Sequence, residues 1–160
     1  MITDKEGING SQNWFNGYID KIEKATGQNH KKFGDFFLCP CCGYPTLTER
    51  VAWDICVLCH WEDDGQDDPH AHEVWGGPNS NYSLSEAREN FRKHYTMYRP
   101  SDERAFSNGR VRKSSSGKLL LDKVALKKSI IERYQQLFNT TDEKQIQNLW
   151  REIEKLEKKL

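Results

Sequence analysis

The sequence predicts a mixed α+β fold in which a small cysteine-centred β unit is followed by helices. All five cysteines fall between Cys39 and Cys59, and short runs of strand-forming residues lie beside them. The last third of the chain carries apolar residues at helical spacing. The chain has 160 residues, of which 36% are hydrophobic and 30% charged, which suits one domain with a small core and an appendage.

Composition argues against two classes of protein. The 24 basic side chains balance 24 acidic ones, so no overall positive field draws the chain to a nucleic acid. No apolar run approaches the roughly 18 residues that span a bilayer. Residues 1–6 lack the basic and apolar regions of a signal peptide. We therefore predict a cytoplasmic protein without a membrane segment.

Residues 1–32 are predicted to be an N-terminal helical segment. Trp14, Tyr18 and Ile22 recur every four residues, so they would share one face of a helix. The next unit, residues 33–106, contains the apolar run Phe36–Leu38, which predicts a strand that leads into the first cysteines.

Two Cys-x-x-Cys pairs are the strongest signal in the sequence. Residues 43–55 separate them, and this gap is close to that of known four-cysteine zinc sites. A reducing cytosol disfavours a disulfide framework, whereas zinc takes four thiolates tetrahedrally. The paired cysteines are therefore predicted to hold a structural Zn²⁺ with every coordination position filled by protein. These predicted ligands are Cys39, Cys42, Cys56 and Cys59.

Other interpretations of these cysteines stay open. Thiolates alone do not select the metal, so an iron site of the rubredoxin kind would use the same ligands. Some of the residues could instead be ordinary buried thiols. Cys41 belongs to neither pair, and we predict a spectator thiol there, although it could exchange with a neighbour as ligand.

Each pair is predicted to form a metal-binding turn, and we name these turns the first knuckle (Cys39–Gly43) and the second knuckle (Cys56–His60). Gly43 follows the last cysteine of the first knuckle, where a positive φ is often needed. His60 takes that place in the second knuckle, which is a weaker match. Strand-forming residues at 46–48 and 51–53 predict a hairpin between the knuckles, and the three parts together make a zinc ribbon.

A strongly acidic segment and a helix are predicted to follow. Residues 61–73, the acidic loop, hold six carboxylates and neither lysine nor arginine. The capping box Ser83–Glu86 predicts a helix to about Tyr98, which Arg99–Pro100 ends. The predicted buried stripe of this helix is Ala87, Phe91 and Tyr95.

Residues 107–118 are predicted to be a linker, and residues 119–160 a C-terminal helical hairpin. Thr140–Glu143 is the capping signal of its second helix. Apolar residues in that helix alternate spacings of three and four, which is typical of a coiled-coil seam. They are Ile146, Leu149, Ile153, Leu156 and Leu160. The seam predicts packing on the preceding helix or, as the sharper alternative, a homodimer through this helix.

The segment from about Phe36 to Phe106 resembles the bacterial cysteine-rich CPCC family. The resemblance lies in Cys39–Tyr44, Asp54–Cys59, Trp61–Asp67, Gly76–Asn79 and Leu84–Phe91. It implies a small zinc-ribbon-like domain with an acidic loop and one helix, and it implies no defined activity. Many members look like accessory genes of mobile or toxin-bearing loci, which implies an immunity or antitoxin role.

The acidic loop is predicted to be part of a surface that binds a partner protein. Complementary charge speeds the encounter with a basic partner, such as a nuclease toxin that must hold phosphates. Tryptophans at the borders of the loop would serve as anchors. The predicted surface comprises Trp61, Glu62, Asp63, Asp64, Asp67, Asp68 and Trp75. The plainer alternatives are a solvated charge run and tryptophans packed in the core.

We therefore predict a zinc-stabilised protein-binding module without enzymatic activity, namely an immunity protein or antitoxin that masks a toxin. The first alternative is a nucleic-acid-associated zinc ribbon, because residues 110–133 hold eight basic side chains, Lys127 and Lys128 among them, against two acidic ones. The second is a metal-dependent hydrolase that uses His70 and His72, although the sequence carries no catalytic motif.

Overall fold

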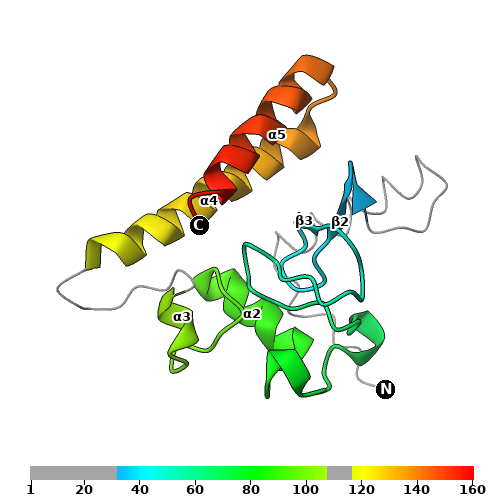
Figure 1. The fold of residues 1–160 in the computed structure, drawn as a ribbon, viewed down its shortest axis with the longest axis vertical. Helices are drawn as coiled ribbons and strands as arrows, with labels where there is room; N and C mark the ends of the chain where they lie inside the picture. Colours follow the sequence, from blue (N-terminus) through cyan, green and yellow to red (C-terminus); the bar gives the residue numbers. More distant parts are fainter. Residues whose placement is uncertain (1–31, 108–116) are drawn as a thin grey trace, which may run out of the picture.

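A small antiparallel sheet, four α-helices and two short 3₁₀ helices (Asp68–His70 and Gly77–Asn79) occupy residues 32–107 and 117–160, which are the residues that the computed structural model describes. The strands are β1 (Lys32–Phe33), β2 (Phe36–Leu38) and β3 (Pro45–Leu47), and the helices are α2 (Leu84–His94), α3 (Arg104–Ser107), α4 (Gly117–Asn139) and α5 (Glu143–Glu157). Figure 1 shows α4 and α5 paired at one end of the molecule, with the sheet and α2 beneath them. The helix predicted around Trp14, Tyr18 and Ile22 and most of the predicted linker lie outside the described residues.

The sheet has the strand order β1–β2–β3, and both strand pairs are antiparallel. Gly34 turns the chain between β1 and β2 with a φ of +59°, and a Cβ on Gly34 would lie 3.3 Å from the ring of Trp150. The first knuckle joins β2 to β3, and Phe37 lies opposite Leu47. The predicted strand at Phe36–Leu38 is confirmed, and it leads directly into the first cysteine.

The strand predicted at residues 51–53 is wrong. Val51 and Trp53 have φ angles of +59° and +63°, which no strand contains. Both N–H groups donate to Asp63, Val51 to the carboxylate at 2.7 Å and Trp53 to the carbonyl at 3.2 Å. These local hydrogen bonds override the strand preference of the residue types, because that preference depends on context. β3 pairs with β2 instead, and an isolated bridge between Ile55 and Glu62 spans the second knuckle.

Helix α2 begins as predicted and ends four residues earlier than expected. The Ser83 hydroxyl accepts a hydrogen bond from the Glu86 N–H at 3.1 Å, which satisfies one free amide of the first turn. Tyr95 ends the helix with a φ of +60°. Beyond it, the Met97 N–H donates to the Cys59 carbonyl at 2.8 Å. The chain therefore leaves the helix in order to bond to the second knuckle.

The predicted C-terminal helical hairpin is present as the pair α4 and α5. The Asp142 carboxylate caps α5 by accepting from the Gln145 N–H at 2.8 Å. Leu149 and Ile153 of the predicted seam are buried in the core of this chain. The seam of α5 therefore packs on α4 within one chain, as expected. The alternative, a homodimer through α5, stays a prediction.

One hydrophobic core joins the sheet, both knuckles, α2, α4 and α5. Rings from the sheet and its loops meet rings of the hairpin: Phe33 lies edge-on to Phe138 at 5.0 Å, and Tyr44 stacks on Tyr134 at 5.4 Å between ring centroids. The predicted boundary between residues 33–106 and 119–160 stays a prediction, although these contacts place both parts around the same core.

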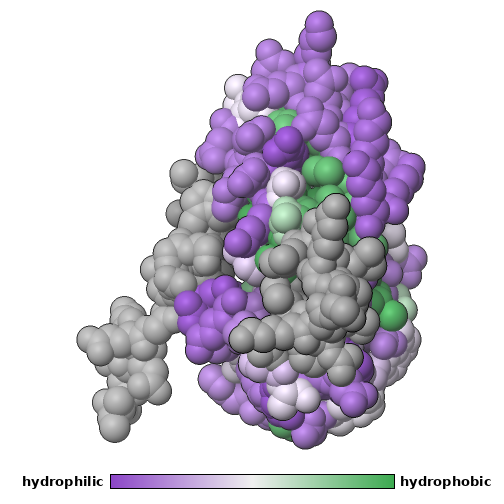
Figure 2. All heavy atoms as spheres, turned by 90° about the vertical axis from the view of Figure 1, so that its left-hand side faces the viewer, coloured by the Kyte–Doolittle hydropathy of each residue, from purple (hydrophilic) through white to green (hydrophobic). Residues whose placement is uncertain are grey.

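The outer faces of the helical hairpin are hydrophilic. Figure 2 shows the upper part of one side of the molecule covered mainly by hydrophilic residues, with hydrophobic residues gathered below them. None of the helices in the described part of the chain is both long and apolar enough to cross a membrane.

Candidate metal centre

Each knuckle presents two sulfur atoms from one tight turn. In the first knuckle the Gly43 N–H donates to the Cys39 carbonyl at 2.8 Å, and in the second the His60 N–H donates to the Cys56 carbonyl at 2.9 Å. The closing residues have φ angles of +83° at Gly43 and +70° at His60. The same turn therefore recurs in both knuckles, with a glycine in one and a histidine in the other.

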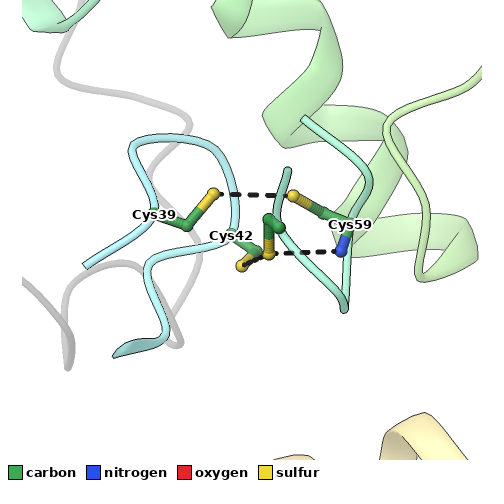
Figure 3. A group of neighbouring side chains, drawn as sticks. Cys39, Cys42 and Cys59 are labelled. Carbon is green, nitrogen blue, oxygen red and sulfur yellow. Dashed lines mark hydrogen bonds between the residues drawn. The ribbon is translucent and has the colours of Figure 1, made fainter. Parts of the chain in front are cut away.

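The four cysteines of the two pairs come together. Their Sγ atoms all lie within 4.8 Å of one another. Cys39 Sγ is 3.6 Å from Cys59 Sγ, and Cys42 Sγ is 3.5 Å from Cys56 Sγ, so each close contact joins the two knuckles (Figure 3). Four thiolates about 2.3 Å from one zinc ion would stand about 3.8 Å apart. The cluster is therefore compatible with a metal ion.

Hydrogen-bond donors point at these sulfur atoms. The Thr46 hydroxyl of β3 lies 3.0 Å from Cys56 Sγ, and the Cys59 N–H donates to the same atom at 3.5 Å. The Trp61 N–H donates to Cys59 Sγ at 3.4 Å. Donors of this kind stabilise thiolates and orient them toward a metal.

The electrostatics of the cluster also fit a cation. Burial raises the pKa of the Cys39, Cys42 and Cys59 thiols well above the ordinary value. Burial acts in the same direction on Cys56, but hydrogen bonds from the neighbouring thiols and Thr46 bring its pKa well below that value. One thiol therefore ionises readily while the others resist a second negative charge. A metal ion held by these four thiols would offset that resistance, because its positive charge would replace the thiol protons.

Cys41 is buried but does not belong to the group of converging sulfur atoms. Burial raises the pKa of its thiol, which keeps it protonated. The sulfur atom of Cys41 therefore lies apart from the group formed by the four predicted ligands. That Cys41 is a spectator thiol stays a prediction.

Comparison with models of protein families assigns the segment that contains this centre. Residues 37–110 match the model of the family described as Cysteine-rich CPCC. Residues 37–110 are a cysteine-rich CPCC domain. The resemblance predicted from the sequence is confirmed, and all four converging cysteines lie inside the CPCC domain. No curated protein and no solved structure matches the chain.

The acidic loop of the CPCC domain is built around a buried carboxylate. Asp63 is completely buried, and it accepts hydrogen bonds from Arg50 Nε at 2.8 Å and from the Val51 N–H at 2.7 Å. Arg50 also pairs with Asp67 at 3.0 Å. The prediction that Asp63 binds a partner is therefore wrong, because its carboxylate is enclosed and already engaged. Such pairing is needed there, since an unpaired buried charge is costly.

The acidic loop carries less free charge than its sequence suggests. Arg88 of α2 pairs with Asp68 at 2.6 Å and donates to the Pro40 carbonyl at 2.8 Å, which ties the loop to the first knuckle. Arg50 and Arg88 lie outside the loop in sequence, so a count over the loop alone misses them. Four carboxylates of the predicted surface keep some exposure, and their role stays a prediction: Glu62, Asp64, Asp67 and Asp68.

The two tryptophans at the borders of the acidic loop have opposite environments. Trp61 is completely buried in the core. Its predicted role as a surface anchor is therefore wrong, and the plainer alternative of core packing holds. Trp75 is 45% exposed, and its indole N–H donates to Glu73 at 2.8 Å. Its role as an anchor stays a prediction.

Sequence analysis missed a group of exposed apolar side chains beside the acidic loop. Val51, Trp53 and Ile55 are 61%, 58% and 55% exposed. The sequence signal for this surface is that the three residues stand at alternate positions along the chain. The same alternation, however, predicts a strand with one buried face, so it did not reveal that these side chains are exposed. Val74, beside Trp75, is 55% exposed.

The histidines of the hydrolase alternative do not join a metal-ligand cluster. His70 Nδ1 lies 3.0 Å from the Glu73 carboxylate, and His72 Nδ1 lies 3.1 Å from the Ser85 hydroxyl. Among residues 32–107 and 117–160, the group whose ligand atoms converge is that of the four cysteines.

The basic residues of the nucleic-acid alternative are only partly described. Lys127 is 1% exposed, so its ammonium group is shielded from phosphates. Lys128 is exposed and lies over the ring of Tyr95, 5.4 Å from its centroid. Arg133 pairs with Glu152 at 3.1 Å. Arg110, Arg112 and Lys113 lie outside the described residues.

Proposed function

We propose that the four-cysteine cluster binds one Zn²⁺ ion and that this ion has a structural role. Four converging thiolates would fill the tetrahedral positions of zinc and leave none open to a substrate. Metal analysis of the purified full chain tests this. We expect one zinc per chain and a colourless protein, whereas one iron per chain with visible absorption would identify the iron alternative and contradict zinc.

We infer that the zinc-stabilised CPCC domain is a protein-binding module, and specifically an immunity protein or antitoxin that binds a toxin. The observation that carries this proposal is the exposed apolar group Val51, Trp53 and Ile55. Single exposed apolar residues are ordinary, but three large ones that stand at alternate positions of one short segment support a binding surface. Tryptophan in particular dominates the energetics of protein interfaces.

The backbone that carries these side chains supports the same proposal. A left-handed conformation is unfavourable for the β-branched Val51 and costs on the order of 1 kcal/mol or more. The buried pair of Arg50 and Asp63 holds it in place. Strained backbone that is fixed by a buried ion pair is typical of functional sites, since it presents a rigid surface and lowers the entropy cost of binding.

The charge beside these residues favours a basic partner. Glu62 is bridged to Ile55, and Asp64 follows the buried Asp63, so carboxylates adjoin the exposed apolar group. A nuclease toxin carries positive charge where it holds phosphates, and complementary charge would steer the encounter and set specificity. The proposed contact surface is therefore apolar at its centre and acidic at its border.

Coexpression with the product of the neighbouring gene tests the proposal. We expect that product to inhibit growth when expressed alone, and the full chain to relieve the inhibition and to copurify with it. Trp53→Ala should weaken the complex about 30-fold, the effect of an interface hot spot. Asp64→Lys should weaken it more at low salt than at high salt.

Matched controls separate binding from folding. Both variants should keep the zinc content of the parent, and Trp53→Ala should also keep its melting temperature, because the Trp53 side chain is exposed. Asp64→Lys should lower the melting temperature slightly, because the carboxylate accepts from the Gln66 N–H at 3.0 Å. Glu103→Lys makes the same charge change at an exposed site in another segment, and it should leave the complex intact. A neighbouring gene product that is harmless and does not bind would contradict the antitoxin role. Undiminished binding by Trp53→Ala would contradict the assigned surface.

A further inference from the structure

The backbone on the two sides of the second knuckle pairs as a short antiparallel ladder, which comprises residues 54–56 and 61–63. Its central pair is the bridge between Ile55 and Glu62. Two backbone hydrogen bonds of 2.9 Å flank this pair, from the Cys56 N–H to the Trp61 carbonyl and from the Asp63 N–H to the Asp54 carbonyl. The bridge is therefore a pair without hydrogen bonds of its own, in which the N–H and carbonyl groups of both residues point toward the outer edges of the ladder.

The two outer edges of the ladder differ. At one edge the Glu62 N–H donates to Asn79 Oδ1 at 3.1 Å, and Asn79 Nδ2 donates to the Glu62 carbonyl at 2.8 Å. The buried side-chain amide of Asn79 thus takes the place of a further strand. At the other edge, within residues 32–107 and 117–160, the N–H and carbonyl of Ile55 have no hydrogen-bond partner. We call this second edge the open edge.

Large apolar side chains stand at the open edge. Ile55 and Trp53 are both more than half exposed. Free backbone groups beside exposed apolar side chains pair readily with another chain, so proteins usually cover such an edge or protect it with charge or proline. An extended segment of a partner can bind there as an added strand, with backbone hydrogen bonds for affinity and side-chain contacts for specificity.

The charge beside the open edge favours a basic segment. Side chains of a directly opposed pair lie on one face and close together, so the partly exposed Glu62 adjoins the side chain of Ile55. In the described part of the chain, the Glu62 carboxylate forms no ion pair. A second copy of the chain would bring the same carboxylate to the interface, whereas a basic segment of another protein would complement it.

We propose that a basic partner protein adds an extended segment to the open edge at Ile55 as a further strand. The inference rests on the proposed binding of a basic toxin and states how that toxin is held. The N–H and carbonyl of Ile55 bond to the backbone of the segment, its apolar side chains pack on Trp53 and Ile55, and a basic side chain pairs with Glu62.

Variants of Ile55 test the role of its backbone N–H in the complex with the product of the neighbouring gene. Ile55→Pro removes this N–H, and proline is accepted at an edge where the N–H faces solvent. We expect the complex to weaken about 10-fold, as for one lost hydrogen bond. Ile55→Val is the matched control, because it keeps the N–H and has as many side-chain carbon atoms as proline. It should bind within about threefold of the parent. Equal weakening by both variants would overturn the proposal, since side-chain contact alone would then explain the binding.

Amide hydrogen exchange of Ile55 in the parent chain is a second measurement, and it decides the question if Ile55→Pro loses zinc or melts early. The amide should exchange freely in the zinc-loaded full chain and at least about 10-fold more slowly in the complex. A complex that leaves this amide unprotected would overturn the added strand and keep the proposed function. A neighbouring gene product that does not bind would refute the proposed function itself. Self-association of the parent that Ile55→Pro abolishes would overturn the basic partner and identify a second copy as the occupant.

Discussion

The two knuckles share a backbone turn and differ in the residue that completes it. The amide that follows the last cysteine closes both turns, at 2.8 Å in the first knuckle and 2.9 Å in the second. That position has a positive φ in both, which glycine adopts freely and histidine does not. The two knuckles therefore adopt the same turn with different residues at this position. The residue type changes only the free-energy cost of the positive φ, which is small for glycine and larger for histidine.

The residue after each turn is aromatic, and here the knuckles diverge in environment. Tyr44 of the first is partly buried and stacks on Tyr134 of α4. Trp61 of the second is completely buried in the core. Both knuckles are largely buried, so the difference lies in the aromatic residue that follows each: Trp61 is enclosed by the core, and Tyr44 lies at its edge. A metal ion bound between the knuckles would join two buried turns of the same core.

The largest expected effect comes from removing a shared sulfur atom. Cys56→Ser should abolish stoichiometric metal binding and cooperative unfolding, because Cys56 Sγ faces Cys42 and also accepts from Thr46 and Cys59. Metal analysis and thermal unfolding measure both effects. Cys41→Ser is the control, since its sulfur atom lies outside the cluster, and it should keep full metal content. Loss of metal from the control would place Cys41 among the ligands.

The next largest effect is the loss of stability expected when the aromatic ring that follows each knuckle is removed. Trp61→Ala should cost about 3–5 kcal/mol, as expected for removing a large buried ring. Tyr44→Ala should cost about 2 kcal/mol, because part of that ring is already exposed. Chemical denaturation of the zinc-loaded full chain measures both changes in the free energy of unfolding. Equal losses would contradict the view that Trp61 supports the core more than Tyr44 does.

Sequence reasoning found the metal centre because its ligands are set by local spacing. Two Cys-x-x-Cys pairs predict two knuckles whatever surrounds them, and the capping residues Ser83 and Asp142 likewise act within one turn. The strand at Phe36–Leu38 and the helical hairpin follow from periodicity that is equally local.

The sequence could not reveal features that depend on distant partners. Asp63 is buried because Arg50 reaches it from 13 residues away, and Lys127 is buried against a carbonyl 32 residues away. Val51 and Trp53 have strand-forming side chains, yet bonds to Asp63 hold them in a left-handed conformation. A pattern along the chain does not contain such pairings, so the acidic loop was predicted to be more exposed than it is.

A smaller effect is expected from adding a Cβ at the position of positive φ in the first knuckle. Gly43→Ala should cost about 1–2 kcal/mol, because a Cβ is unfavourable at a φ of +83°. It should also lower metal affinity, since this turn carries two of the ligands. Gly76→Ala is the matched control, with a φ of +75° and open space around the new Cβ. Because its ψ of −147° lies near a region that is essentially restricted to glycine, its stability loss should be at least as large as that of Gly43→Ala, while its metal affinity should be unchanged in a chelator competition. A parallel loss of metal affinity would show that backbone strain anywhere has this effect.

The smallest effect is expected at the equivalent position of the second knuckle. His60 already bears the strain of a positive φ, and within the described residues its buried Nδ1 has no hydrogen-bond partner. His60→Gly removes both costs, each on the order of 1 kcal/mol, and gives up the packing of a partly buried ring. These terms oppose one another, so the free energy of unfolding of the zinc-loaded chain should change by less than about 1 kcal/mol. A loss as large as that of Trp61→Ala would mean that the imidazole, and not only the turn, is needed at the metal centre, and the two knuckles would then differ in chemistry as well as in environment.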